Sequence, residues 1–121
     1  AIWEQYRGLV PPLLGRFLAK SQLWYEDEIA WYAHAGAQPG VPFRQTPSEV
    51  LLWGAGDFLA ADDDWGKPVV CGHYEVSQPV ITGTKVCLDT AAYRTGILTA
   101  MRMHDRALIQ VSRSARPAVR R

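Results

Sequence analysis

Two histidines follow apolar, strand-like runs and have glycine close by. His34 ends the run IAWYAH and is followed by Gly36, whereas His73 ends the run VVCGH and is preceded by Gly72. Neutral imidazole is a common nitrogen ligand for transition metals, and glycine lets an ion or a phosphate approach the backbone closely. The repeated context strengthens the case for a metal site but does not by itself outweigh a structural role. Taken one at a time, such histidines are more often core or turn residues than ligands, and their spacing matches no compact ligand motif.

Other residues with reactive side chains have weaker contexts. Asp89 closes a third apolar run, and it is either an acceptor that orients a ligand imidazole or a turn-forming residue. Cys71 and Cys87 lie inside apolar runs and belong to no C-x-x-C pair, so we expect buried, inert thiols. His104 falls in a predicted hairpin turn, where we expect it to be exposed.

About six strands and two short helices are predicted to position these residues. The second helix begins at TPSE, which reads as a capping box with Thr46 as the N-cap. The strands gather in the C-terminal half without alternating with helices, so the pattern predicts an α+β fold rather than a doubly wound sheet. The strands are expected at 23–26, 29–34, 67–71, within 80–88, at 98–103 and at 107–111, and the helices at 12–20 and 47–53.

The composition of the 121 residues, with 48% apolar residues and a net charge of +1, is typical of one soluble globular domain. No apolar run approaches the ~20 residues of a membrane span, and no signal peptide is evident, so we expect a cytoplasmic protein without membrane contacts. Four arginines and no acid fall within 112–121. We therefore expect a body at 1–111 and a disordered basic tail, which argues against a nucleic-acid partner for the body.

Four segments in this order resemble the C-terminal half of the catalytic domain of bacterial serine/threonine phosphatases of the PPP type, within the calcineurin-like metallophosphoesterase superfamily. The resemblance covers 11–111. It is carried by the strand ending in H-A-G at 34–36, L-L-W at 51–53, V-C-G-H at 70–73 and D-T-A-A…G-I-L-T-A at 89–100.

The resemblance implies the second half of a four-layer αββα sandwich with a mixed sheet. It implies that His34 and His73 bind one of two divalent ions, manganese first and iron or zinc as alternatives. It also implies that the whole domain hydrolyses phosphate monoesters on serine or threonine of a phosphorylated protein, by attack of a metal-activated water. The residues expected near the ion or the phosphate are Gly36, Gly72, Asp89, Tyr93 and Arg94.

The chain also departs from the family pattern. It lacks the family's upstream ligand motifs G-D-x-H-G, G-D-x-x-D-R-G and G-N-H-E, and with them the general-acid histidine. We therefore identify no catalytic acid or base in this segment and expect it to be inactive alone. Inside the match, GAGD follows L-L-W where the family has an arginine, the G-H-T-P turn reads GHYE, and the D-T-G glycine is Ala91. Arg94 is the nearby cation that would partly replace the missing arginine.

Two alternatives remain open from the sequence. One is a symmetrical dinucleoside polyphosphate hydrolase of the same superfamily, and the other is a catalytically degenerate module that acts through protein contacts. A half-domain would also expose the apolar inner face of its sheet, so we expect a marginally stable or self-associating chain. The residues predicted for that face are Trp24, Trp31, Val69, Val70 and Leu98.

Overall fold

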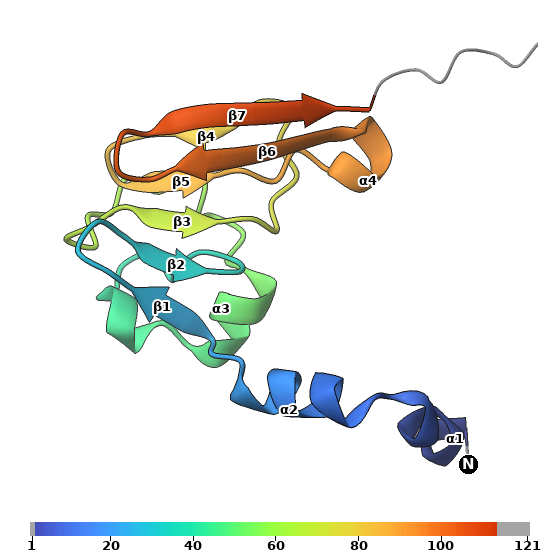
Figure 1. Cartoon of the computed structure of the whole chain (residues 1–121). Helices are drawn as coiled ribbons and strands as arrows, with labels where there is room; N and C mark the ends of the chain where they lie inside the picture. Colours follow the sequence, from blue (N-terminus) through green and yellow to red (C-terminus); the bar gives the residue numbers. More distant parts are fainter. Residues whose placement is uncertain (1, 114–121) are drawn as a thin grey trace, which may run out of the picture.

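The computed structural model describes residues 2–113, which form a five-stranded mixed sheet and a separate two-stranded hairpin (Figure 1). The α+β class and the mixed sheet are therefore confirmed for this part of the chain. The predicted basic tail lies outside the described residues from 114 onward, and Ser112 belongs to the last strand. The elements are α1 (Ile2–Leu9), α2 (Pro12–Lys20), β1 (Trp24–Glu26), β2 (Trp31–Ala33), a 3₁₀ turn (Phe43–Gln45), α3 (Ser48–Trp53), β3 (Val69–Cys71), β4 (Val80–Ile81), β5 (Lys85–Cys87), α4 (Ala92–Thr95), β6 (Ile97–Arg102) and β7 (Ala107–Ser112).

The five-stranded sheet has the order β1-β2-β3-β5-β4. Its three central strands, β2, β3 and β5, are parallel, and the edge strands β1 and β4 are antiparallel to their neighbours. Parallel strands end at the same edge of a sheet, and ligands tend to bind at that edge. His34, His73 and Asp89 each follow one of these three strands within two residues.

One face of this sheet is covered by the segment 35–66. Trp31, Val69 and Cys87 point toward it, and the Trp31 and Phe43 rings stack with centroids 4.5 Å apart. The prediction of an uncovered inner face is therefore wrong for Trp31 and Val69, which are 7% and 0% exposed. Its other members differ, since Trp24 and Val70 are half-buried and Leu98 is exposed. The shielding comes from within the chain itself.

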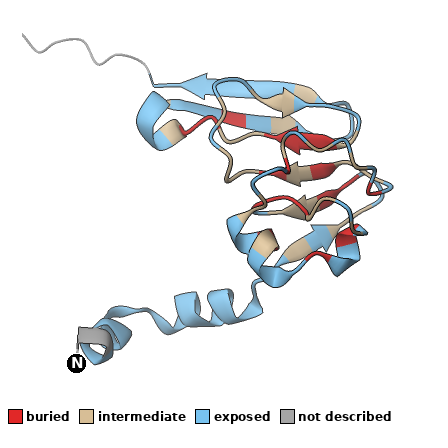
Figure 2. Ribbon diagram, turned by 180° about the vertical axis from the view of Figure 1, so that it is seen from behind, coloured by how far each residue is buried: buried red, intermediate tan, exposed pale blue. Residues whose placement is uncertain are grey.

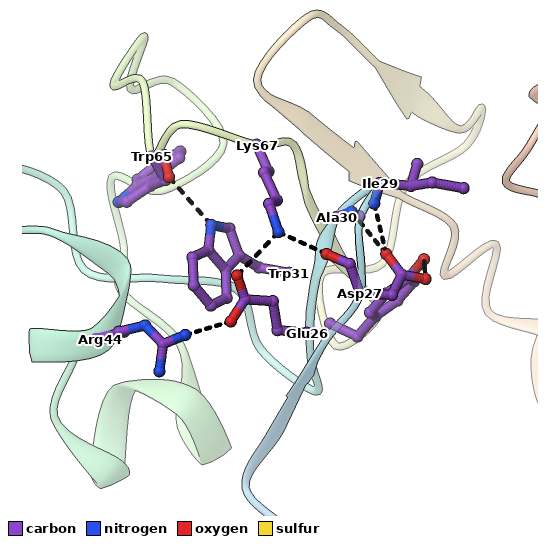
Figure 3. Close-up of polar contacts among 9 residues, drawn as sticks. Glu26, Asp27, Ile29, Ala30, Trp31, Arg44, Trp65 and Lys67 are labelled. Atoms are coloured by element: carbon purple, nitrogen blue, oxygen red, sulfur yellow. Dashed lines mark hydrogen bonds and ion pairs between the residues drawn. The ribbon is translucent and has the colours of Figure 1, made fainter.

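A charged cluster fastens the β1–β2 turn to the segment that enters β3 (Figure 3). The Lys67 ammonium donates to Glu26 Oε1 at 2.8 Å and to the Asp27 carbonyl at 2.5 Å, while Arg44 pairs with the other oxygen of Glu26. Both cations lie over the Trp31 ring, at 5.1 Å for Arg44 and 5.4 Å for Lys67. The Trp31 indole N–H donates to the Trp65 carbonyl at 3.0 Å. These contacts hold β2 and β3 side by side.

Lys85 is a buried cation on the core face of β5. It is 2% exposed, and its ammonium donates to the carbonyls of Phe58 at 3.0 Å, of Leu59 at 3.1 Å and of Ala61. A buried charge must be compensated by hydrogen bonds. Here three backbone oxygens do so, and the loop that supplies them is fixed against the sheet.

The two N-terminal helices extend away from the sheet (Figures 1 and 2). Helix α2 has the predicted bounds and no buried residue, and Leu13 and Phe17 are 71% and 67% exposed. Helix α1 was not predicted. None of the helices within 2–113 combines the length and the apolar character needed to cross a membrane.

Several sequence-based expectations for local structure are wrong. The capping box does not form, because Pro47 is the N-cap of α3 and the Thr46 hydroxyl accepts the Gln38 N–H at 3.3 Å instead. The single strand expected within 80–88 is two antiparallel strands, β4 and β5, since the Thr82 hydroxyl accepts the Lys85 N–H at 3.1 Å and closes a turn. The short helix α4 and the 3₁₀ turn were also missed. The turn around His104 is confirmed, and that residue is exposed.

Removal of the Lys85 charge tests its structural role. We expect Lys85→Met to lower the free energy of unfolding by about 2–4 kcal/mol, because one buried and two partly buried carbonyls lose their donor. Lys67→Met is the matched control. The Lys67 side chain is 30% exposed, so we expect a loss of about 1 kcal/mol or less. Denaturant unfolding followed by tryptophan fluorescence measures both, and equal losses would contradict the special position of Lys85.

Candidate metal centre

The structure brings the two histidines together at the edge of the sheet. His34 Nε2 and His73 Nδ1 are 3.2 Å apart, and the two rings meet at 76°. His34 directly follows β2, and His73 comes two residues after β3, the parallel neighbour of β2. The side chain of His34 is exposed and that of His73 is half-buried, so the pair opens to solvent.

The backbone around the pair is tightly specified. The Gly72 N–H donates to the His34 carbonyl at 3.0 Å, which extends the β2–β3 pairing to the histidines. His73 has a φ of +63°, in the left-handed region that costs a non-glycine residue about 1–2 kcal/mol. Such strain persists only where surrounding contacts hold it, and it often occurs at functional sites.

Tyr74 supplies many of those contacts. Its hydroxyl accepts the Ala55 N–H at 2.9 Å. The hydroxyl proton is shared between two acceptors, the Ala35 carbonyl at 3.0 Å and the Ala55 carbonyl at 3.1 Å. Burial raises the pKa of Tyr74, so the hydroxyl keeps the proton that it donates. Its ring stacks on Phe58 at 5.4 Å and meets the edge of His73 at 5.3 Å. Tyr74 thus joins the three loops that follow β2, α3 and β3.

Gly36, predicted to lie near the site, has a structural reason to be glycine. Its φ is +81°, and a Cβ at this position would lie 2.7 Å from the Phe58 ring, which is fully buried. Gly54 is similar, with a φ of +82° and the Tyr74 hydroxyl 2.6 Å from its Cβ position. These glycines let Phe58 and Tyr74 pack against the loops that bear the histidines.

Asp89 lies beside Gly72, at the end of the third parallel strand. Its Oδ1 accepts the Ala91 N–H at 3.0 Å, which is the turn-forming role, and its Oδ2 is 4.0 Å from the Cβ position of Gly72. Within residues 2–113 it forms no hydrogen bond to either histidine. Ala91, which stands where the resembling family has glycine, has a left-handed φ of +52°. A shallow pocket here is lined by Gly72, Leu88, Asp89, Thr90, Ala92, Leu98 and Thr99.

Arg94 and Tyr93 are both held by Glu75. The Tyr93 hydroxyl donates to Glu75 Oε1 at 2.6 Å, and the Arg94 guanidinium donates to Oε2 at 2.7 Å. The hydrogen bond from Tyr93, followed by that from Arg94, holds the pKa of Glu75 below its ordinary value. Arg94, which we expect to replace the missing arginine in part, is therefore paired with the carboxylate of Glu75, a residue of the altered G-H turn.

The two cysteines are buried and free, as expected. Cys71 and Cys87 are paired in register on neighbouring strands, and the Cys87 thiol is within hydrogen-bond distance of the Gly72 carbonyl at 3.6 Å and the Tyr74 carbonyl at 3.4 Å. The interaction between the two neighbouring thiols lowers the pKa of Cys87 and raises the pKa of Cys71, which burial raises further. This pairing could not be predicted from local sequence, because it depends on the order of the strands in the sheet.

The donor set fits part of a metal site. Two nitrogens bound to one tetrahedral ion at about 2.0–2.1 Å lie about 3.3 Å apart, close to the separation of the two imidazoles. A hydrogen bond between the rings fits the same distance if one of the facing nitrogens carries the proton. No group of three or more histidine, cysteine, aspartate or glutamate side chains in the described part of the chain is arranged to hold a metal ion.

Neither the protein-family models nor the curated protein sequences give a match to this chain.

Gly36→Ala tests the packing that supports the site. We expect it to lower the free energy of unfolding by roughly 3 kcal/mol or more, through backbone strain and collision with the Phe58 ring. Gly40→Ala is the matched control, because its φ is +80° but no atom lies within 4 Å of its Cβ position. We expect a loss of about 1 kcal/mol there. Thermal or denaturant unfolding compares them, and equal losses would rule out the steric contribution of Phe58.

Proposed function

We propose that residues 11–111 are the C-terminal half of the catalytic domain of a cytoplasmic, metal-dependent phosphatase that acts on phosphoserine or phosphothreonine in proteins. In this proposal the half-domain belongs to a four-layer αββα sandwich of the metallophosphoesterase type. The observation that carries it is the close approach of His34 and His73, whose ring nitrogens are 3.2 Å apart although the residues lie far apart in sequence.

The sheet topology supports this reading of the histidine pair. A metal site needs ligands on rigid elements that converge on one point. Two parallel strands deliver one imidazole each to the same edge, and the Gly72 N–H bond to the His34 carbonyl fixes their spacing. A left-handed residue at His73, held by neighbouring contacts, is also more easily explained at a site than in a plain turn.

The residues of this chain would hold one divalent ion and leave space beside it. His34 and His73 bind the ion through neutral nitrogens, and Gly72 keeps the adjoining backbone free of side-chain bulk. A bound ion of this kind lowers the pKa of a water molecule and neutralises phosphate charge. Within the described residues we assign no acid or base to the reaction, so in this proposal the remaining ligands and the proton donor come from the other half of the domain.

A second candidate is a phosphatase-like module that has lost catalysis and binds other proteins. The Glu75–Arg94 ion pair favours it, because it occupies the guanidinium that we expect to contact phosphate. Ala55 also stands in the loop where the resembling family places its arginine, and its backbone is bound by Tyr74.

Metal binding to the chain separates the ligand role from a hydrogen-bonded pair. We expect isothermal titration with Zn²⁺ to give weak, single-site binding, because two imidazoles without a carboxylate do not offset the charge of the ion. His34→Ala and His73→Ala should each abolish the binding. His104→Ala is the control and should leave it unchanged, since His104 lies in the exposed β6–β7 turn. Binding that survives both single variants, or no binding by the parent chain, would contradict the ligand role.

Hydrolysis tests the half-domain assignment. We expect little or no manganese-dependent hydrolysis of p-nitrophenyl phosphate by residues 1–121. A longer chain whose upstream sequence carries G-D-x-H-G, G-D-x-x-D-R-G and G-N-H-E should hydrolyse it, and His73→Ala should remove that activity. Strong turnover by the short chain that His34→Ala abolishes would show that the missing ligands are not needed. An unrelated upstream sequence would favour the interaction module.

A further inference from the structure

The last strand, β7, is an exposed edge without the usual protection. Within 2–113 it pairs only with β6, and five of its six residues are exposed. Natural edge strands are kept from pairing with other chains by charged residues, proline or bulges. Its sequence, ALIQVS, contains no charged residue and no proline, and its pairing with β6 is continuous over all six residues.

The hydrogen-bond pattern of the hairpin identifies which backbone groups are free. The Arg113 N–H donates to the Gly96 carbonyl at 2.9 Å, so these opposed residues form a hydrogen-bonded pair. Such pairs alternate along an antiparallel ladder, which places Val111, Ile109 and Ala107 in bonded pairs with β6. The N–H and carbonyl groups of the alternate residues therefore face outward. They belong to Leu108, Gln110 and Ser112.

We propose that two copies of this chain associate through β7, antiparallel about a twofold axis at Gln110. In this register Gln110 lies opposite Gln110 of the second copy, and Leu108 lies opposite Ser112 of the second copy. All three outward-facing residues of each strand then form bonded pairs, with about six new backbone hydrogen bonds. The two hairpins become one four-stranded sheet.

The side chains of β7 complement those of a second copy in this register. Leu98, Ile109 and Val111 share one face of the hairpin and are 62%, 52% and 61% exposed. The twofold register places Ile109 opposite Val111 of the second copy at the close, non-bonded positions, where cross-strand aliphatic contacts are strongest. Arg113 of one copy lies opposite Ala107 of the other copy, so the two Arg113 side chains do not face each other. The same apolar face then continues across the dimer.

This interface is separate from the candidate metal centre and does not rest on the proposed function. It uses neither histidine and no residue of the loops that Tyr74 joins. It also replaces the predicted association through the sheet face of Trp31 and Val69, which the chain itself covers.

A charge swap at the twofold axis tests the proposal. In sedimentation velocity the unmodified chain should form a reversible dimer. Gln110→Lys and Gln110→Glu should each sediment as monomers, because two like charges then lie directly opposite each other. An equimolar mixture of the two variants should dimerise again, since Lys and Glu then face each other. Gln110→Thr is the matched control and should keep the dimer, because threonine is uncharged and favourable in strands.

Other outcomes would overturn the proposal. A monomeric parent chain would do so, as would dimers that persist in both charged variants. Monomeric variants whose mixture stays monomeric would rule out the Gln110 register. Association that disappears in Phe17→Lys but not in Gln110→Lys would place the interface on the exposed face of α2. Circular dichroism of each variant verifies that a monomer is folded.

Discussion

The buried ammonium of Lys85 is the constraint on which the rest of the core depends. A charge that is 2% exposed destabilises a protein unless hydrogen bonds compensate it, and the three carbonyls that do so come from one loop. The loop must therefore lie against β5. It carries Phe58, and the position of that ring in turn requires glycine at 36 and a stacking partner at Tyr74. The two histidine loops are thus placed by a lysine that lies on a different strand.

The same chain of contacts explains how a strained residue is retained at the site. His73 has an unfavourable, left-handed φ. The next residue, Tyr74, offsets this cost through a packed ring and a hydroxyl that forms hydrogen bonds with Ala35 and Ala55. Preorganised sites need such support, because a ligand on a free loop loses entropy when it binds. The charged cluster around Trp31 acts at the other end of the same strands, where Lys67 and Glu26 hold β2 and β3 in register.

Much of this could be predicted from sequence wherever the signal was local. Apolar periodicity after Pro11 gave α2 its bounds, and the apolar runs before His34 and His73 indicated strands that end at the histidines. The wrong or missing predictions concern contacts between residues that are distant in sequence. The Thr46 hydroxyl had two available amides and bonded Gln38 rather than the helix, and nothing local distinguishes Lys85 from a surface lysine. The cysteine pair and the role of Tyr74 likewise exist only once the strand order is known.

The residues at which the chain departs from the pattern of the phosphatases that it resembles contact one another. Tyr74 occupies the turn and binds the backbone of Ala55, in the loop that lacks the arginine, while Glu75 binds Arg94. These contacts indicate that the turn packs as a unit. The Arg94–Glu75 pair is exposed on both sides, and exposed ion pairs contribute little to stability. A doubly charged phosphate would compete with the singly charged Glu75 carboxylate for that guanidinium, because both accept charge-assisted hydrogen bonds and the phosphate carries more charge. The pair therefore favours the interaction module without excluding a phosphatase, and what distinguishes the two candidate functions is whether further metal ligands join the two histidines.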